Sequence, residues 1–119
     1  LDIMLPTVLS ENYFKNPLIP IDLMKQARQE ANEDKQALFK LMRATKERPD
    51  YRPELKKISV PTLIIQGEKD TLFPVHMAQE VADSIPNANL IVIPFVGHTL
   101  NLEAVPQMVK AMKDFIVAI

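Results

Sequence analysis

Residues 61–70 read Pro-Thr-Leu-Ile-Ile-Gln-Gly-Glu-Lys-Asp, and this stretch decides the fold class. Behind the proline, the short β-branched and apolar run 62–66 predicts a buried strand. The next four residues form a predicted loop that ends at Asp70. Pro74 begins a predicted helix that runs to about Ile85, and one side of this helix is apolar, formed by Ala78, Val81, Ala82 and Ile85. The stretch therefore opens a strand–loop–helix unit.

A second unit of this kind completes the chain. Residues 89–93 (Asn-Leu-Ile-Val-Ile) predict another strand, followed by a loop. Pro106 begins the final predicted helix, and its apolar stripe is formed by Val109, Met112, Phe115, Ile116 and Ile119. Strand, helix, strand and helix at this spacing predict a β-α-β-α arrangement with two parallel neighbouring strands. Residues 58–119 are therefore assigned to an α/β core.

Residues 1–57 follow a different pattern, which predicts helices. The first 20 residues combine apolar residues with three prolines and predict an irregular segment or one short helix. Asp22 is a good N-cap for a helix that runs to about Ala31, before Asn32 interrupts the pattern. The apolar residues of the first 20 either line a substrate pocket or pack the helices onto the sheet, and we favour packing.

Two more helical stretches complete this segment. A helix from about Glu33 to Glu47 has apolar residues at the i, i+3, i+4, i+7 spacing, which predicts one buried face. That face is formed by Leu38, Leu41, Met42 and Thr45. Pro49 ends this helix, and Pro53 begins one more helical turn through Lys57.

Each predicted strand is followed by a loop that contains a glycine and an ionisable residue of possible catalytic use. Asp70 ends the loop after the first strand, and His98 follows Gly97 in the loop after the second. Parallel strands end at one edge of a sheet, where open α/β folds bind ligands, so the two side chains can meet. A histidine near neutral pKa can move protons, and a carboxylate on its other nitrogen fixes the tautomer. We predict that Gly97 provides the turn that presents His98 outward.

Other interpretations of these residues are open. A single aspartate after a strand is commonly a turn former, and a histidine beside glycine is commonly a plain turn residue. Glu68 is a second candidate for the carboxylate. For His76, in the first turn of a predicted helix, an exposed structural role is favoured, and a metal shared with Asp70 and His98 is a weak alternative. Glu103 either supports the histidine loop or favours the N-terminus of the last helix.

The two strand-end loops resemble a known family. The stretch 61–70, with a proline four residues later, resembles the loop of the catalytic acid in α/β-hydrolases. The stretch 96–98 (Val-Gly-His), followed by Glu103, Pro106 and an amphipathic helix, resembles their catalytic-histidine loop and closing helix. Pro106 stands three residues after Glu103, where the family more often has two. The resemblance implies the C-terminal β-α-β-α part of an α/β-hydrolase sheet.

The same resemblance implies roles for two residues. Asp70 corresponds to the acid of the catalytic triad and His98 to its base, and no cofactor or metal is implied. Residues 1–57 resemble the end of the helical cap that these enzymes insert before the last strands.

The nucleophile that would complete the triad is missing. In this family it is usually a serine in G-x-S-x-G on a sharp strand-to-helix turn. The chain has only two glycines, Gly67 and Gly97, and no cysteine, so no such motif exists in it. Its three serines, Ser10, Ser59 and Ser84, lie at positions that do not resemble that turn. We therefore expect the chain alone not to catalyse triad hydrolysis.

Composition narrows the class of protein further. The 119 residues are 47% hydrophobic, and 14 basic and 15 acidic residues give a net charge of −1. This balance favours neither nucleic acid nor an anionic membrane as a partner. We see no basic-then-apolar leader and no span-length apolar run, and the absence of cysteine fits a cytoplasmic protein. The chain begins at Leu1, which is compatible with truncation, and two glycines against ten prolines suggest that much of such a fold lies elsewhere.

Two hypotheses about function follow. The first is a C-terminal piece of an α/β-hydrolase that acts on ester or related bonds of a small molecule when whole. The second is a catalytically inert module that associates with itself, because two strands leave both edges and much apolar surface uncovered. We accordingly expect a homodimer or association with the missing N-terminal half.

Overall fold

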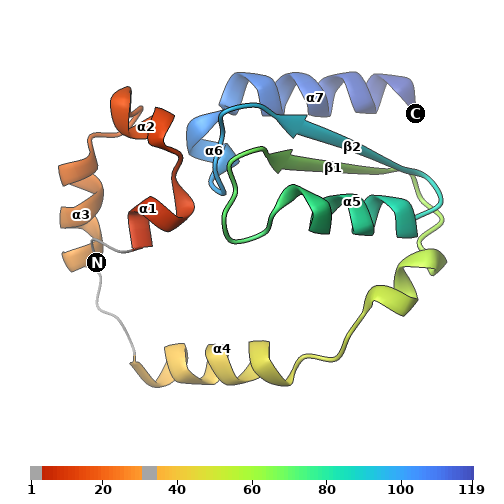
Figure 1. Cartoon of the computed structure of the whole chain (residues 1–119), viewed down its shortest axis with the longest axis horizontal. Helices are drawn as coiled ribbons and strands as arrows, with labels where there is room; N and C mark the ends of the chain where they lie inside the picture. The colour runs from red at the N-terminus through yellow and green to blue at the C-terminus, as the bar shows by residue number, and fades with distance from the viewer. Residues whose placement is uncertain (1–3, 31–34) are drawn as a thin grey trace.

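The computed structural model describes residues 4–30 and 35–119 and contains a small parallel sheet with helices around it (Figure 1). Strands β1 (Thr62–Gly67) and β2 (Ala88–Ile93) pair in parallel, in a register that joins Thr62 to Ala88 and Gly67 to Ile93. Helix α5 (Val75–Ser84) connects them on one side, and α7 (Val105–Ala118) lies on the other (Figure 1). The predicted α/β fold class with two parallel neighbouring strands is thus confirmed.

Helices make up the part of the chain before the strands. Two short helices, α1 (Met4–Val8) and α2 (Glu11–Lys15), replace the predicted irregular segment or single helix. They are followed by the three predicted helical stretches, α3 (Ile21–Glu30), α4 (Lys35–Glu47) and the 3₁₀ helix η1 (Arg52–Lys57). The predicted N-cap is wrong, because α3 begins at Ile21 and Asp22 lies inside its first turn. The predicted boundaries at Ala31, Asn32 and Glu33 lie outside the described residues.

The predicted buried face of α4 is wrong. Leu38, Leu41 and Met42 are 48%, 64% and 59% exposed, and Thr45 is exposed as well. In Figure 1, α4 lies apart from the strand pair, so its apolar side meets no layer of the sheet. The 3.6-residue period predicted the helix correctly, but it carries no information on whether the covering surface is present.

The apolar stripe of α7 is also mostly uncovered. Of the five residues predicted for it, Phe115 alone is half-buried; the others are exposed, at 38% for Val109, 46% for Met112, 64% for Ile116 and 72% for Ile119. The side that is covered includes Met108 and the buried Ala111. Two strands are too narrow to cover both flanks of this helix. For the same reason the strands are less buried than predicted, and Ile91 and Val92 of β2 remain exposed.

The core lies at the carboxyl ends of the strands, where two clusters of buried residues are found. One consists of Leu5, Leu9 and Tyr13 in the α1–α2 region, and Leu102 of the short helix α6 (Leu100–Glu103) packs against it. The other consists of Ile93, Val96 and Ala104, with Ile65 and Leu100 packed beside it. Helix α6 thus joins the first helices to the sheet (Figure 1). No helix in the described ranges is long and apolar enough to cross a membrane.

Candidate active site

Asp70 and His98 meet at the carboxyl edge of the sheet. Asp70 lies in the loop after β1, and His98 lies in the loop after β2. Asp70 Oδ2 is 2.9 Å from His98 Nδ1. The aspartate side chain is only 5% exposed, whereas the histidine side chain is 37% exposed. The pair therefore has a buried carboxylate on one side and an imidazole that reaches solvent on the other.

Four donors surround the Asp70 carboxylate. The backbone N–H groups of Leu72 and Phe73 donate to Oδ1 at 2.9 and 3.0 Å. Gln66 Nε2 donates to Oδ2 at 3.0 Å and also to the carbonyl of Phe73, which fixes the loop around the carboxylate. Burial raises the pKa of Asp70, but the hydrogen bonds from Phe73, His98, Gln66 and Leu72 outweigh it, so the pKa lies below its ordinary value. Asp70 is therefore held ionised near neutral pH.

The ionised carboxylate determines the tautomer of His98. A carboxylate can only accept hydrogen bonds, so the Nδ1 of His98 must carry the proton that it shares with Asp70. In the neutral imidazole, Nε2 is then an acceptor, and it has no hydrogen-bond partner among residues 4–30 and 35–119. The ring lies 5.6 Å from the ring of Phe73, which limits its rotation. This arrangement suits a general base that takes a proton on Nε2.

Replacing Asp70 by asparagine is expected to lower the free energy of unfolding by about 1–3 kcal/mol near pH 7, since the amide has one acceptor oxygen and one NH₂ group and cannot accept from all four donors around the carboxylate. The folded-state pKa is depressed, so the ionised Asp70 contributes stability above its unfolded pKa of about 3.9, and this is lost as pH falls through the folded pKa. In urea denaturation, the free energies of unfolding of wild type and Asp70→Asn should differ near pH 7, and this difference should narrow below about pH 4. A difference of unchanged size in acid would contradict this account.

The two glycines are required because the two loops approach each other closely, and not because either residue has a positive φ angle. A Cβ on Gly67 would lie 2.1 Å from the carbonyl oxygen of Gly97, and a Cβ on Gly97 would lie 2.8 Å from both Glu103 Oε1 and the backbone nitrogen of Ser10. Neither glycine has a positive φ. The prediction that Gly97 provides a special turn for His98 is therefore wrong, because its small size is what the loop needs.

The left-handed residue of this loop is Phe95, with φ of 63°. Its N–H donates to Glu68 Oε2 at 3.0 Å, and the turn returns the chain so that the carbonyl of Val96 accepts from Lys69 N–H at 2.8 Å. An aromatic residue in this region is strained, and the Phe95 side chain gains little burial in return because the residue is 65% exposed.

Phe95→Gly is expected to be more stable than Phe95→Ala by about 1 kcal/mol, because glycine adopts positive φ without a Cβ penalty. Both variants remove the aromatic ring, so their comparison isolates the backbone. Thermal unfolding followed by circular dichroism measures the difference. Equal stability of the two variants would show that the loop relaxes to negative φ when the ring is absent.

The other candidate residues lie away from the pair or have other partners. Glu68 accepts from Phe95 N–H and forms an ion pair with Lys69 at 3.6 Å, so it does not replace Asp70 on the imidazole. The Phe95 hydrogen bond is the main reason that the pKa of Glu68 lies below its ordinary value. His76 is exposed in the first turn of α5. Within the described ranges there is no group of three or more histidine, cysteine or acidic residues that could hold a metal.

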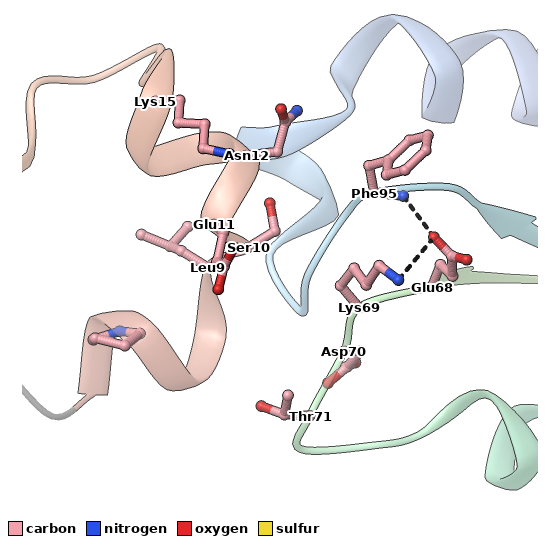
Figure 2. A pocket seen from close by; sticks show the side chains of 11 residues that line it. Leu9, Ser10, Glu11, Asn12, Lys15, Glu68, Lys69, Asp70, Thr71 and Phe95 are labelled. Atoms are coloured by element: carbon pink, nitrogen blue, oxygen red, sulfur yellow. Dashed lines mark hydrogen bonds and ion pairs between the residues drawn. The ribbon is translucent and has the colours of Figure 1, made fainter.

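A cleft of about 690 Å³ lies between the first helices and the strand-end loops (Figure 2). One wall comes from the α1–α2 region and includes Ser10 and Lys15; the other comes from the loops and includes Asp70 and Phe95. Among the apolar residues of positions 4–20, Pro6 and Leu9 line this cleft, and Leu5, Leu9 and Tyr13 form a buried cluster against Leu102 of α6, so the segment both lines the cleft and packs.

The chain belongs to the α/β-hydrolase fold family. A family model described as alpha/beta hydrolase fold matches residues 16–105. The observed strands, connecting helix and final helix form part of this fold, and the matches correspond to a C-terminal portion of longer hydrolases. The resemblance inferred from the two loops is thus confirmed.

Particular relatives are hydrolases by name. RutD of Pseudomonas savastanoi pv. phaseolicola, which is named as a carbamate hydrolase, is 32% identical over 67 residues, covering 56% of this chain and 26% of that protein. Monoacylglycerol lipase abhd6-A of Xenopus laevis is 29% identical over 103 residues, covering 87% of this chain and 31% of that protein. A thermophilic esterase from Thermogutta terrifontis has a similar structure, with a TM-score of 0.77 and 25% identity over 98% of this chain and 42% of that one. The chain thus spans less than half the length of each of these proteins.

Proposed function

We propose that this chain supplies the base and the orienting acid of an α/β-hydrolase that cleaves ester or related acyl bonds. His98 is the proposed general base and Asp70 the proposed acid of the triad. The observation that carries the proposal is the 2.9 Å contact between Asp70 Oδ2 and His98 Nδ1, which leaves Nε2 as the acceptor.

The proposed reaction uses Nε2 twice. A nucleophile hydroxyl on another segment transfers its proton to Nε2 while its oxygen attacks the acyl carbon, and the resulting imidazolium gives that proton to the leaving alcohol. Water then attacks the acyl-enzyme, with Nε2 again accepting and returning a proton. Asp70 stays ionised throughout and stabilises each imidazolium, which is consistent with its depressed pKa and its four donors.

The nucleophile in this proposal lies outside these 119 residues. The two glycines of the sequence exclude G-x-S-x-G, and the chain covers only part of its relatives. The names of the relatives include a carbamate hydrolase, a monoacylglycerol lipase and an esterase, so the proposed bond class is an acyl ester or carbamate.

The test is made on the whole enzyme, with these residues preceded by the upstream part of their own coding sequence. If no upstream part exists, the chain is coexpressed with the N-terminal portion of the Thermogutta terrifontis esterase. We expect hydrolysis of p-nitrophenyl acetate and covalent labelling of the nucleophile by a fluorophosphonate. A folded assembly that contains a G-x-S-x-G serine and neither hydrolyses the ester nor reacts with the probe would reject the proposal.

A second proposal, association through uncovered apolar surface, is favoured by the exposed sides of α4 and α7. When the chain is expressed alone, light scattering is expected to give a molar mass of at least twice its 13.5 kDa, because burying exposed apolar surface lowers the free energy of the associated form. Ile116→Glu should shift the measured mass toward the monomer, whereas Lys113→Glu on the same helix should not. A monomer at high concentration for the wild type would contradict self-association.

A further inference from the structure

The Glu103 carboxylate lies against the histidine loop and accepts several hydrogen bonds there. It ends α6 and is half-buried. Gly97 N–H donates to its Oε2 at 3.2 Å, and Thr99 Oγ1 donates to its Oε1 at 3.2 Å. These two donors flank His98 on either side in the sequence. The carboxylate therefore holds the loop that carries the proposed base.

The same carboxylate also holds the start of α2. Ser10 N–H donates to Glu103 Oε2 at 3.0 Å, and the Ser10 hydroxyl donates to the same oxygen. Ser10 is buried and its hydroxyl caps α2 by accepting from Tyr13 N–H. Glu103 thus connects two segments that are 93 residues apart in the sequence.

A second set of hydrogen bonds joins these segments beside Glu103. The carbonyl of Val8 accepts from the N–H groups of His98 and Thr99 at 3.0 and 3.2 Å, and the single hydroxyl hydrogen of Thr99 is shared between this carbonyl and Glu103 Oε1, each 3.2 Å from Oγ1. Gly97 lies between Glu103 and Ser10 with no room for a Cβ. Residues 97–99 are therefore held between residues 8–10 on one side and Glu103 on the other.

These contacts decide between the two interpretations of Glu103 left open by the sequence. A carboxylate that only favoured the start of α7 would face the N–H groups of that helix. Glu103 instead accepts from Ser10, Gly97 and Thr99. Its partners belong to the histidine loop and to the segment that carries one wall of the cleft.

We propose that Glu103 is a positioning residue that fixes His98 against Asp70 by clamping residues 97–99 to residues 8–10. The proposal rests on the proposed function, because it assigns Glu103 a role that acts through the base. Displacing a catalytic base by about 1 Å can lower the rate by about 100-fold, so such a clamp has a measurable effect on catalysis.

The test uses proton NMR of the chain as it is, with Glu103→Gln as the main variant. Glutamine keeps the shape but has one uncharged acceptor oxygen in place of two oxygens that share a negative charge, so the hydrogen bonds from Ser10 and Gly97 weaken even where that oxygen faces them. We expect amide exchange of Ser10 and Gly97 to accelerate about 10- to 100-fold, and the hydrogen-bonded Nδ1–H resonance of His98 to be lost. Asp114→Asn, which removes an exposed carboxylate of α7, should leave both signals unchanged.

Three outcomes distinguish the two proposals. In the first outcome, the Nδ1–H signal of wild type persists in Glu103→Gln, and the amide exchange rates of Ser10 and Gly97 are unchanged. This outcome would overturn the clamp and leave the Asp70–His98 pair intact. A wild type without that signal would overturn the pair and the clamp together. If Glu103→Gln fails to fold, Ser10→Ala decides, since it removes one donor to the carboxylate and should accelerate amide exchange of Gly97 and weaken the Nδ1–H resonance of His98. In the whole enzyme, a clamp predicts that Glu103→Gln lowers kcat with little change in KM.

Discussion

His98→Ala in the whole enzyme is expected to reduce kcat/KM for p-nitrophenyl acetate by about 10⁴-fold or more. The reason is that the Nδ1–H of His98 already donates to Asp70 Oδ2, so Nε2, which has no hydrogen-bond partner among the described residues, is the ring nitrogen that can take up a proton. Without it, the nucleophile remains protonated and the leaving group departs without a proton. Steady-state kinetics on purified enzyme measures the change.

His76→Ala is the matched control, because the chain has two histidines and His76 is exposed on α5. It should retain activity within about twofold. Asp70→Asn should fall between the two, with a loss of about 10²- to 10⁴-fold, because the imidazole remains while its tautomer and orientation are no longer fixed. Full activity of His98→Ala together with a loss of activity in His76→Ala would show that the base is His76 and that its assignment to His98 is wrong.

Gly67→Ala is expected to lower the free energy of unfolding by about 3 kcal/mol or more, enough to unfold much of so small a core. The added Cβ would lie 2.1 Å from the oxygen of Gly97 and 2.6 Å from the oxygen of Val96. Both are backbone atoms, and the Val96 carbonyl is held by the N–H of Lys69, so neither moves aside easily. Thermal and urea unfolding followed by circular dichroism would measure the loss.

Gly97→Ala provides the graded comparison for this variant. Its Cβ would approach Glu103 Oε1 and the backbone nitrogen of Ser10 at 2.8 Å, which are longer distances than the two at Gly67, and one of the two atoms belongs to a side chain. We expect a loss of about 1–3 kcal/mol, smaller than that of Gly67→Ala. If Gly67→Ala unfolds at the same temperature as the wild type, the two loops can separate without a loss of stability.

Local patterns predicted both strands and helices α5 and α7, but they missed the short helix α6 and the division of the first segment into α1 and α2. Pro61 and the run after it predicted β1, and the proline before α5 predicted the start of that helix. The burial of α4 and α7 could not be predicted in the same way. An amphipathic pattern shows which side of a helix is apolar, and whether Leu41 or Ile116 is covered depends on elements that two strands do not provide.

The proximity of Asp70 and His98 followed from parallel strands ending at one edge. The residues that hold them did not, because Gln66, Val8 and Ser10 act through contacts that no short motif encodes. Gln66 offered one usable signal, a polar side chain in an apolar strand. The strain at Phe95 was hidden because aromatic residues rarely take positive φ, so the sequence favoured Gly97 for the special turn.

Glu103 and Val8 each contact a residue far away in the sequence, and this has a consequence for the order of folding. The hydrogen bonds from Ser10 to Glu103 and from Thr99 to Val8 close loops of 93 and 91 residues. Contacts of such high sequence separation form late, since the chain entropy of closing a long loop must be overcome first. During synthesis, helices α1 and α2 can contact the histidine loop and Glu103 only after residues 97–103 have left the ribosome. The histidine loop is therefore expected to be among the last parts of the molecule to become ordered, after the strands have already paired.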